Sequence, residues 1–312
     1  MEVSKSKHII YGCMGLGGSW DNSPYNAEHI ITARKAIHAA LELGITSFDH
    51  ADIYNLGKAE KVFGVILQEN PGLRDLIKIQ TKAGIVLANG KGYNTYNSSR
   101  DYFLTQINKS LKNLNTDYLD TFIIHRPDPL MDVEEVAETF DYLKSEGLVR
   151  RFGVSNMSLK QIELLQYYCD MPISANQIQF SLRHASLIDE GITFNMKGSD
   201  QNAVGDLLPF SKLHNLELQA WGALDNGYYL SDKGNPDDLR VKKILQQLSL
   251  KYNSNPTAIL LAWIFKLPYA IKPIIGSTNP ERIALATKAV NLDISREDWY
   301  ELFITARNKT IP

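Results

Sequence analysis

Segments with the apolar periodicity of helices alternate with short apolar segments of strand type along this 312-residue chain, and this alternation constrains the fold most. Near the N-terminus, a helical stretch ends before Gly44 and the buried strand ITSF follows at 45–48. Strict alternation is typical of a parallel sheet, and eight repeats in about 300 residues are typical of a closed barrel. The sequence therefore predicts an α/β fold, a (β/α)8 TIM barrel, in a single domain spanning residues 1–312.

The predicted elements cover most of the chain, and no linker or change in composition divides it. Asp132 and Glu135 stand where a capping box would begin one helix, and Gly147 would end it. Strands are expected at 8–14, 45–48, 76–82, 118–125, 149–155, 173–180, 216–221 and 270–275. Helices are expected at 30–41, 59–67, 104–114, 133–143, 158–168, 205–214, 237–252, 256–266 and from 280 onward.

Composition excludes several classes of partner. The net charge of -2 creates no global field that would attract nucleic acid or an anionic membrane. The two cysteines, Cys13 and Cys169, are far apart and lack CxxC spacing, which fits a reducing cytoplasm rather than a disulfide scaffold. The first residues lack the apolar core of a signal peptide, and the longest apolar run, 258–265, is too short for a membrane span. We expect a soluble cytoplasmic protein and take a monomer as the working expectation, although the sequence does not determine the oligomeric state.

In a barrel of this kind, functional residues lie on the loops that follow the carboxyl ends of the strands. A lysine, two histidines, a tyrosine and two aspartates gather at these positions, more than a purely structural rim requires. The polar and glycine positions at these ends are Gly17–Trp20, Asp49–Tyr54, Lys82, His125–Asp128, Ser155–Asn156, Gln177, Trp221–Leu224 and Gly276–Asn279.

The stretch FDHADIY, residues 48–54, admits a metal site, a proton-transfer site or an ordinary polar turn. His50 and Asp52 would face the same side of an extended segment, and His125 could complete a metal site as in metal-dependent barrel hydrolases. The H-A-D spacing lacks the second nearby histidine of those enzymes, and Lys82 would place a positive charge beside the cation. We expect no metal, and a structural role for His50 and Asp52.

Two further segments resemble known catalytic or cofactor-binding motifs but do not match their residue patterns. GVSN at 153–156 departs at both ends from the GxSxG pattern of a nucleophilic serine. In MGLGGSW at 14–20, Trp20 stands where a dinucleotide fingerprint requires its third glycine. Neither serine hydrolysis nor a Rossmann site is predicted.

A proton-transfer site fits the polar residues at the strand ends better. A tyrosine with its ordinary pKa near 10 is a poor donor at neutral pH, and a neighbouring ammonium lowers that pKa. Lys82 could act in this way on Tyr54, held by an ion pair with Asp49. His125, at the end of the following strand, could hydrogen-bond a substrate carbonyl and orient it.

The strings FDHADIY, QTKAG and FIIHRPD place Asp49, Tyr54, Lys82 and His125 in a set that resembles the catalytic tetrad of the aldo-keto reductases. GVSN, NQIQFS at 176–181 and GSTNPERI at 276–283 match further segments of that family in the same order. The resemblance runs from about residue 8 to the C-terminus. DHADIY and HRPDPLMD are most similar to a bacterial, NADPH-dependent subgroup.

The resemblance implies a role for each position. Tyr54 is the implied proton donor, Lys82 lowers its pKa, Asp49 positions the lysine, and His125 orients the carbonyl. Ser155, Asn156 and Gln177 are implied to bind the nicotinamide carboxamide, while Trp221 replaces the tyrosine that usually stacks on the ring. Trp20, Tyr54 and His125 are the expected substrate contacts. The full set expected to bind NADPH is Gly17, Gly18, Ser155, Asn156, Gln177, Trp221, Gly222, Ala223, Leu224, Gly276, Ser277, Thr278 and Arg282.

The phosphate end has an independent argument. Asn279 and Pro280 form an N-cap and first-turn pair, and a helix N-terminus binds phosphate. The hydroxyls of Ser277 and Thr278 and the guanidinium of Arg282 favour NADPH over NADH. At three positions the family more often has a lysine or polar residues, which weakens the predicted phosphate site; these positions are Gly276, Leu285 and Ala286.

The sequence thus predicts an oxidoreductase that reduces an aldehyde or ketone by hydride transfer from NADPH, with Tyr54 as general acid. A cofactor-sensing regulatory module with little turnover is the alternative from another class. Substrate contacts are expected from the loops at 84–98, 190–205 and 225–236.

Overall fold

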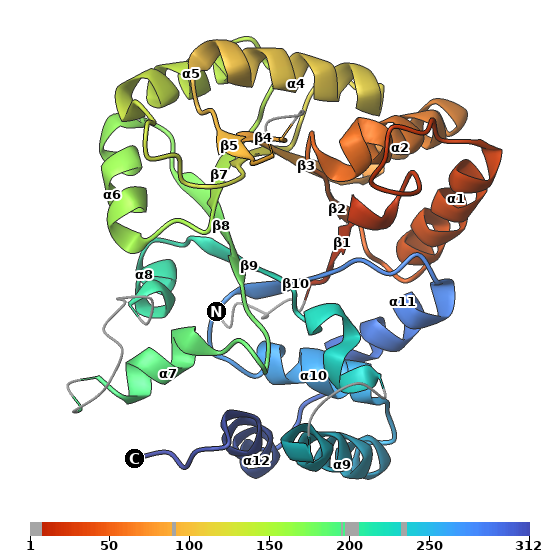
Figure 1. The fold of residues 1–312 in the computed structure, drawn as a ribbon, viewed down its shortest axis with the longest axis vertical. Coiled ribbons are helices and arrows are strands. Elements are labelled where there is room, and N and C mark those ends of the chain that lie inside the picture. The colour runs from red at the N-terminus through yellow and green to blue at the C-terminus, as the bar shows by residue number, and fades with distance from the viewer. Residues whose placement is uncertain (1–7, 89–91, 195, 197–205, 232–235) are drawn as a thin grey trace. The chain divides into compact units, whose positions relative to one another are not determined.

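Eight parallel strands close into one barrel in the computed structural model, which describes residues 8–88, 92–194, 196, 206–231 and 236–312. The order around the barrel is β1-β10-β9-β8-β7-β6-β3-β2. The helices are interleaved with these strands along the chain (Figure 1). The predicted (β/α)8 barrel is confirmed.

Each predicted strand overlaps a strand of the barrel. A hairpin follows β3. The sequence did not reveal it, because its two strands have two residues each and form no periodic pattern. The barrel strands are β1 Ile10–Gly12, β2 Ser47–Asp49, β3 Lys78–Ala83, β6 Thr121–Ile124, β7 Phe152–Ser155, β8 Ile173–Gln179, β9 Glu217–Trp221 and β10 Ile271–Ile275; the hairpin strands are β4 Ile85–Val86 and β5 Thr95–Tyr96.

The nine predicted helices are present, with ends that differ by a few residues. They are α1 Ala27–Glu42, α2 Lys58–Glu69, α4 Arg100–Leu114, α5 Val133–Ser145, α6 Leu159–Tyr168, α8 Leu207–Leu213, α9 Pro236–Lys251, α10 Pro256–Phe265 and α11 Pro280–Thr287. Further helical segments that the sequence analysis did not place are α3 Leu73–Leu76, α7 Ser186–Ile192 and α12 Arg296–Arg307, and the 3-10 turns η1 Cys13–Gly15, η2 Tyr54–Gly57, η3 Asp225–Leu230 and η4 Lys288–Asn291.

Side-chain caps begin several of these helices. Asp132 accepts hydrogen bonds from the backbone N–H groups of Glu134 and Glu135 at the start of α5, so the cap is present without the reciprocal Glu135 bond of a capping box. A complete box begins α6, where Ser158 and Gln161 bond to each other's backbone. The α5 helix therefore starts where the sequence predicts, by a simpler device.

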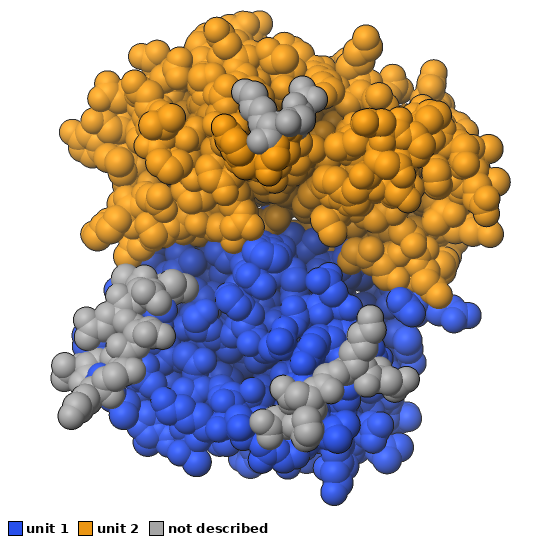
Figure 2. Space-filling model, viewed as in Figure 1, with its two compact units in different colours: residues 1–9, 178–275, 281–312 blue, residues 10–177, 276–280 orange. Residues whose placement is uncertain are grey.

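Two compact units divide the chain (Figure 2). Residues 10–177 and 276–280 form one of them, in which successive aromatic contacts join Phe48 to Phe63 and Phe140 to Phe152. Residues 178–275 and 281–312 belong to the other, whose core includes the stacked rings of Trp263 and Trp299. The single-domain organisation over 1–312 stays a prediction.

The parallel register aligns the residues that matter for the site. Gly12, Asp49 and Gln80 are neighbours across β1, β2 and β3, and Lys82 follows two residues later beside Ile123 of β6. Because parallel strands end on one edge, their last side chains and the loops after them meet there. Among the described residues, no helix is long and apolar enough to cross a membrane.

Candidate active site

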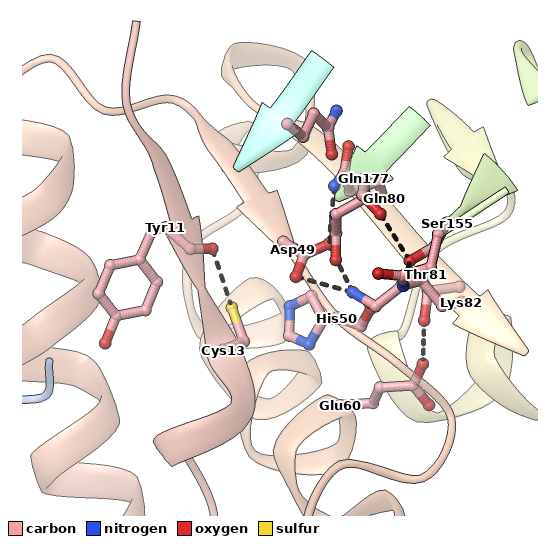
Figure 3. Close-up of polar contacts among 12 residues, drawn as sticks. Tyr11, Cys13, Asp49, His50, Glu60, Gln80, Thr81, Lys82, Ser155 and Gln177 are labelled. Carbon is pink, nitrogen blue, oxygen red and sulfur yellow. Dashed lines mark hydrogen bonds and ion pairs between the residues drawn. The ribbon is translucent and has the colours of Figure 1, made fainter. Parts of the chain in front are cut away.

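Lys82 is the centre of a buried polar cluster at the end of β3 (Figure 3). Its ammonium lies 2.6 and 2.7 Å from the two carboxylate oxygens of Asp49, and 2.8 Å from the backbone carbonyl oxygen of His50. Burial opposes the charge on Lys82, but the Asp49 carboxylate and the Tyr54 hydroxyl outweigh it and raise the pKa of the lysine. The group therefore stays an ammonium at neutral pH, and the predicted ion pair is present.

Asp49 is held by more partners than the sequence analysis expected. One of its oxygens accepts hydrogen bonds from the side-chain amides of Gln80, at 2.7 Å, and Gln177, at 2.9 Å, as well as from Lys82. Gln80 was not among the predicted site residues, although it stands two positions before Lys82 on the same strand and so shares its face. These bonds compensate the desolvation of a carboxylate that is only 2% exposed.

Tyr54 begins the turn η2, five residues after Asp49, and lies beside Lys82. The centroid of its ring is 4.9 Å from the lysine Nζ atom. Burial raises the pKa of Tyr54 to about 12, and the Lys82 ammonium opposes this rise without cancelling it. The sequence analysis was right about the direction of the lysine's effect and wrong about the net shift, because it left burial out. The phenol is protonated at neutral pH.

His125 lies just after β6, with its ring edge-to-face to that of Tyr54 and 6.1 Å between the ring centroids. Burial lowers the pKa of His125 to about 2, with the charges of Lys82 and Arg126 acting in the same direction. The imidazole is therefore neutral, able to donate one hydrogen bond and accept another.

The pair that looked most like metal ligands lies apart from this chemistry. The His50 imidazole is fully buried, packs edge-on against Phe63 with ring centroids 4.7 Å apart, and makes no hydrogen bond with the described residues. Burial, together with the Lys82 charge, lowers its pKa to about 3. Lys82 bonds to the backbone of His50, so the imidazole takes no part in that contact.

Asp52 lies near a second buried carboxyl, that of Glu60 on α2. Burial raises the pKa of Asp52 to about 7, and the charge of Glu60 adds to the rise. Glu60 accepts hydrogen bonds from the Thr81 hydroxyl at 2.8 Å and the Asn113 amide at 3.3 Å, on the opposite face of β3 from Lys82 (Figure 3). Across the described part of the chain, no three His, Cys, Asp or Glu side chains are grouped as a metal ion would require.

The predicted carboxamide ligands are clustered at the ends of β7 and β8. The Ser155 hydroxyl donates to the carbonyl oxygen of Gln177 at 2.9 Å, and the Asn156 amide donates to Ser155 at 2.7 Å. Ser155 and Asn156 do not cap α6, because Ser158 is the N-cap of that helix. The side-chain amide of Gln177 donates to Asp49, and its contact with a cofactor stays a prediction.

The glycines after β1 are required by close packing. Gly17 and Gly18 have φ of +82° and +91°, a region that favours glycine. A Cβ atom on Gly17 would lie 2.8 Å from the backbone of Lys58, and one on Gly18 would lie 2.6 Å from the His29 ring. Trp20 follows with 48% of its surface exposed. The predicted roles of these three residues toward cofactor and substrate stay predictions.

The loop 276–279, between β10 and α11, was expected to hold a phosphate. The Tyr11 hydroxyl, a partner that the sequence did not suggest, donates to the carbonyl oxygen of Ser277 at 3.0 Å. Gly276 is exposed, Ser277 and Thr278 are partly exposed, and α11 begins at Pro280 with Arg282 exposed in its first turn. A helix N-terminus with a guanidinium in its first turn suits a phosphate group, and this role stays a prediction.

Trp221–Leu224 belong to the other compact unit and are described by themselves. Trp221 ends β9 partly exposed, and its carbonyl oxygen accepts a hydrogen bond from the backbone N–H of Phe180. Gly222 has φ of +66° and begins a turn closed by a bond from Asp225. Parts of the three predicted substrate loops, residues 89–91, 195, 197–205 and 232–235, lie outside the described residues.

A barrel with a protonated phenol, an ammonium and a neutral imidazole close together at the carboxyl ends of its strands has groups suited to proton transfer on a small molecule. Comparison with known proteins narrows this chemistry. The sequence matches the Aldo/keto reductase family over residues 8–304. The chain belongs to the aldo/keto reductase family and is an oxidoreductase.

Curated relatives and a solved structure agree with this assignment. The uncharacterized oxidoreductase YcsN of Bacillus subtilis is 34% identical over 281 residues, 88% of each chain. The 6-dehydroglucose reductase of Agrobacterium fabrum is 32% identical over 315 residues, covering 100% of this chain and 97% of that one. A crystal structure of aldo/keto reductase from Klebsiella pneumoniae with NADP and acetate superposes with a TM-score of 0.73, covering 94% of this chain and 89% of that one; its 23% identity bears on the fold alone.

Proposed function

We propose that this protein reduces an aldehyde or ketone to an alcohol, with NADPH as hydride donor and Tyr54 as general acid. The observation that carries the proposal is the buried ammonium of Lys82, held by Asp49 and placed beside the Tyr54 ring. Burying a lysine ammonium costs desolvation free energy even when the ammonium is fully bonded, so structure alone does not explain this lysine. Here it stabilises negative charge on the phenol oxygen after proton donation.

The protonation states support reduction at neutral pH. Because the pKa of Tyr54 is raised to about 12, the phenol holds its proton until a substrate oxygen gains negative charge. His125, neutral and beside the Tyr54 ring, donates a hydrogen bond to the carbonyl oxygen and orients it. Asp49 holds Lys82 in place while Gln80 and Gln177 hold Asp49.

For the cofactor, NADPH would supply the hydride, and this chain's residues would bind and orient it. Ser155, Asn156 and Gln177 offer amide and hydroxyl groups for the carboxamide, and Trp221 and Gly222–Leu224 would contact the nicotinamide side. Gly276, Ser277, Thr278 and Arg282, at the start of α11, would bind the 2′-phosphate. Gly17, Gly18 and Trp20 would line the approach to Tyr54. NADP in a structurally similar aldo/keto reductase supports the choice of dinucleotide.

The sequence-based expectations of a cytoplasmic, monomeric protein without a nucleic-acid or membrane partner are retained as proposals. The expectations of a cytoplasmic location and of no nucleic-acid or membrane partner rest on the net charge and the cysteine count.

The decisive experiment compares Tyr54→Phe with Tyr167→Phe, which removes a hydroxyl from an 81% exposed tyrosine on α6. NADPH oxidation is followed with a carbonyl panel that includes 6-dehydroglucose, the substrate named for one relative. Loss of a general acid lowers kcat by about 100-fold or more, so Tyr54→Phe should show that loss with NADPH affinity within a few-fold of wild type. Tyr167→Phe should match wild type.

Two results would contradict the proposal. Wild-type protein that oxidises no NADPH with any carbonyl, while binding it tightly, would favour the cofactor-sensing module. Full activity of Tyr54→Phe would remove Tyr54 from the mechanism.

A further inference from the structure

The turn that carries Tyr54 has an unusual backbone. The three residues after the tyrosine, Asn55, Leu56 and Gly57, have φ of 48°, 60° and 83°. Glycine adopts this left-handed region freely and asparagine adopts it readily, but leucine does so at a cost. A conformation of this kind persists when the surrounding structure holds it.

One side chain in the turn provides such a hold. Asn55 is 1% exposed, and its amide nitrogen donates to the carbonyl oxygens of Met14, at 2.9 Å, and Leu16, at 2.6 Å. Two carbonyl acceptors require the NH2 end of the amide to face them. The bonds cross from the turn after β2 to the loop after β1.

A second tether runs between the same two segments. The Lys58 ammonium donates to the carbonyl oxygens of Asp21 and Ser23, each at 3.0 Å. Gly17 packs directly against the Lys58 backbone. The segments 13–23 and 54–58 are therefore bonded to each other at several points. Asn55 makes the bonds nearest Tyr54.

The hydrogen bonding of Asn55 indicates that the residue does more than fill space. Its amide oxygen is buried and accepts no hydrogen bond from the described residues, which costs stability. Glycine would fit the left-handed backbone with less strain and leave no such atom. An asparagine at this position is thus explained by what its NH2 group holds.

We propose that Asn55 is a positioning residue for Tyr54: by tying the η2 turn to the carbonyl groups of Met14 and Leu16, it holds the phenol beside Lys82 and His125. The inference rests on the proposed function, since it concerns the donor of that reaction. Asn55 touches no reacting atom and acts through the tyrosine that precedes it.

The test isolates the tether from the backbone. Asn55→Gly keeps the left-handed conformation and removes the amide, whereas Asn55→Asp keeps the shape and sets carboxylate oxygens against two carbonyl acceptors. The matched control is Asn115→Gly, because Asn115 has φ of 52° and an exposed side chain at the end of α4. Thermal unfolding verifies that each variant is folded at the assay temperature.

Three readouts are expected to agree. Misplacement of a reacting group by about 1 Å lowers the rate up to 100-fold, so Asn55→Gly should lower kcat by about tenfold or more and Asn55→Asp at least as much. In a Tyr54→Phe background, Asn55→Gly should change the residual rate by less than about twofold, because its effect passes through the phenol. Hydrogen exchange at residues 14–18 should speed up in both Asn55 variants and stay unchanged in Asn115→Gly.

Failure of the inference and failure of the proposed function give different results. If wild type turns over and Asn55→Gly keeps its kcat, or lowers it equally with and without Tyr54, the function stands and Asn55 loses the positioning role. If wild type reduces no carbonyl, the proposed function fails and the positioning role fails with it, whatever the exchange rates show.

Discussion

At the scale of single residues, the site depends on which polar groups have partners. Lys82 and Asp49 are buried, but they bond to each other and to His50, Gln80 and Gln177. The His50 imidazole is equally buried and stays neutral, with its pKa lowered to about 3. Asp49 and His50 thus differ in charge because Asp49 has an ion partner, whereas burial and the Lys82 charge keep the His50 imidazole neutral.

This contrast yields a prediction for Asp49→Asn. Removing one partner of a buried ion pair leaves an uncompensated charge, which should lower the free energy of unfolding by about 3 kcal/mol or more. Urea unfolding at pH 7 measures the change. Asp293→Asn is the control, since its pair with Lys266 is at the surface and such pairs contribute less than about 1 kcal/mol. Equal stability of the two variants would show that Asp49 does not compensate Lys82.

At the scale of elements, successive side chains of β3 point to two different environments. Lys82 faces the candidate site, whereas Thr81 faces α2 and bonds to Glu60, which also bonds to Asn113 on α4. The two helices come close enough that Gly64 of α2 lies directly under the α4 terminus. The outer face of β3 therefore depends on tight packing of α2 against α4.

Gly64→Ala tests that packing. A Cβ atom at this position would lie 2.0 Å from the carbonyl oxygen of Asn113, so the helices must separate or the α4 end must shift. Overpacking of this kind costs about 1–3 kcal/mol, and thermal unfolding should report a lower melting temperature. Gly191→Ala, in α7 with no described atom within 4 Å of the added methyl group, should be neutral or slightly stabilising. A Gly64→Ala protein as stable as wild type would contradict the close approach.

At the scale of the whole molecule, buried acids and bases decide how stability depends on pH. The folded-state pKa of Asp52 is raised to about 7, above its ordinary value of 3.8, so between these values the folded protein binds more protons than the unfolded chain. Stability from this group is therefore present at low pH and is lost as pH rises toward 7. His50, whose pKa is lowered to about 3, acts in the opposite direction and loses stability as pH falls below about 6.5.

Asp52→Asn should remove the first of these effects. Between pH 5 and pH 7 the variant should gain about 2 kcal/mol of unfolding free energy relative to wild type, since each unit of pH is equivalent to about 1.4 kcal/mol. Urea unfolding across that range measures the gap. Asp293→Asn, an exposed aspartate, should run parallel to wild type. A parallel curve for Asp52→Asn as well would mean that Asp52 is ionised throughout.

By itself, the sequence determined the barrel and singled out Asp49, Tyr54 and Lys82, which the structure brings together. Period and turn signals are local, and eight β/α repeats leave one closed arrangement, so the barrel strands and nine of the helices were found from residues near each other in the chain, whereas α12 was not placed. It missed the two-residue strands of the hairpin and α7, which are too short to show a period.

The tertiary structure alone decided the partners and protonation states. That Gln80 and Gln177 hold Asp49, and that Asn55 ties its turn to Met14 and Leu16, depends on contacts between residues up to 128 positions apart. The net upward shift of the Tyr54 pKa and the net downward shift of the His50 pKa follow chiefly from desolvation. Desolvation belongs to the packed molecule and has no local signature in the order of residues.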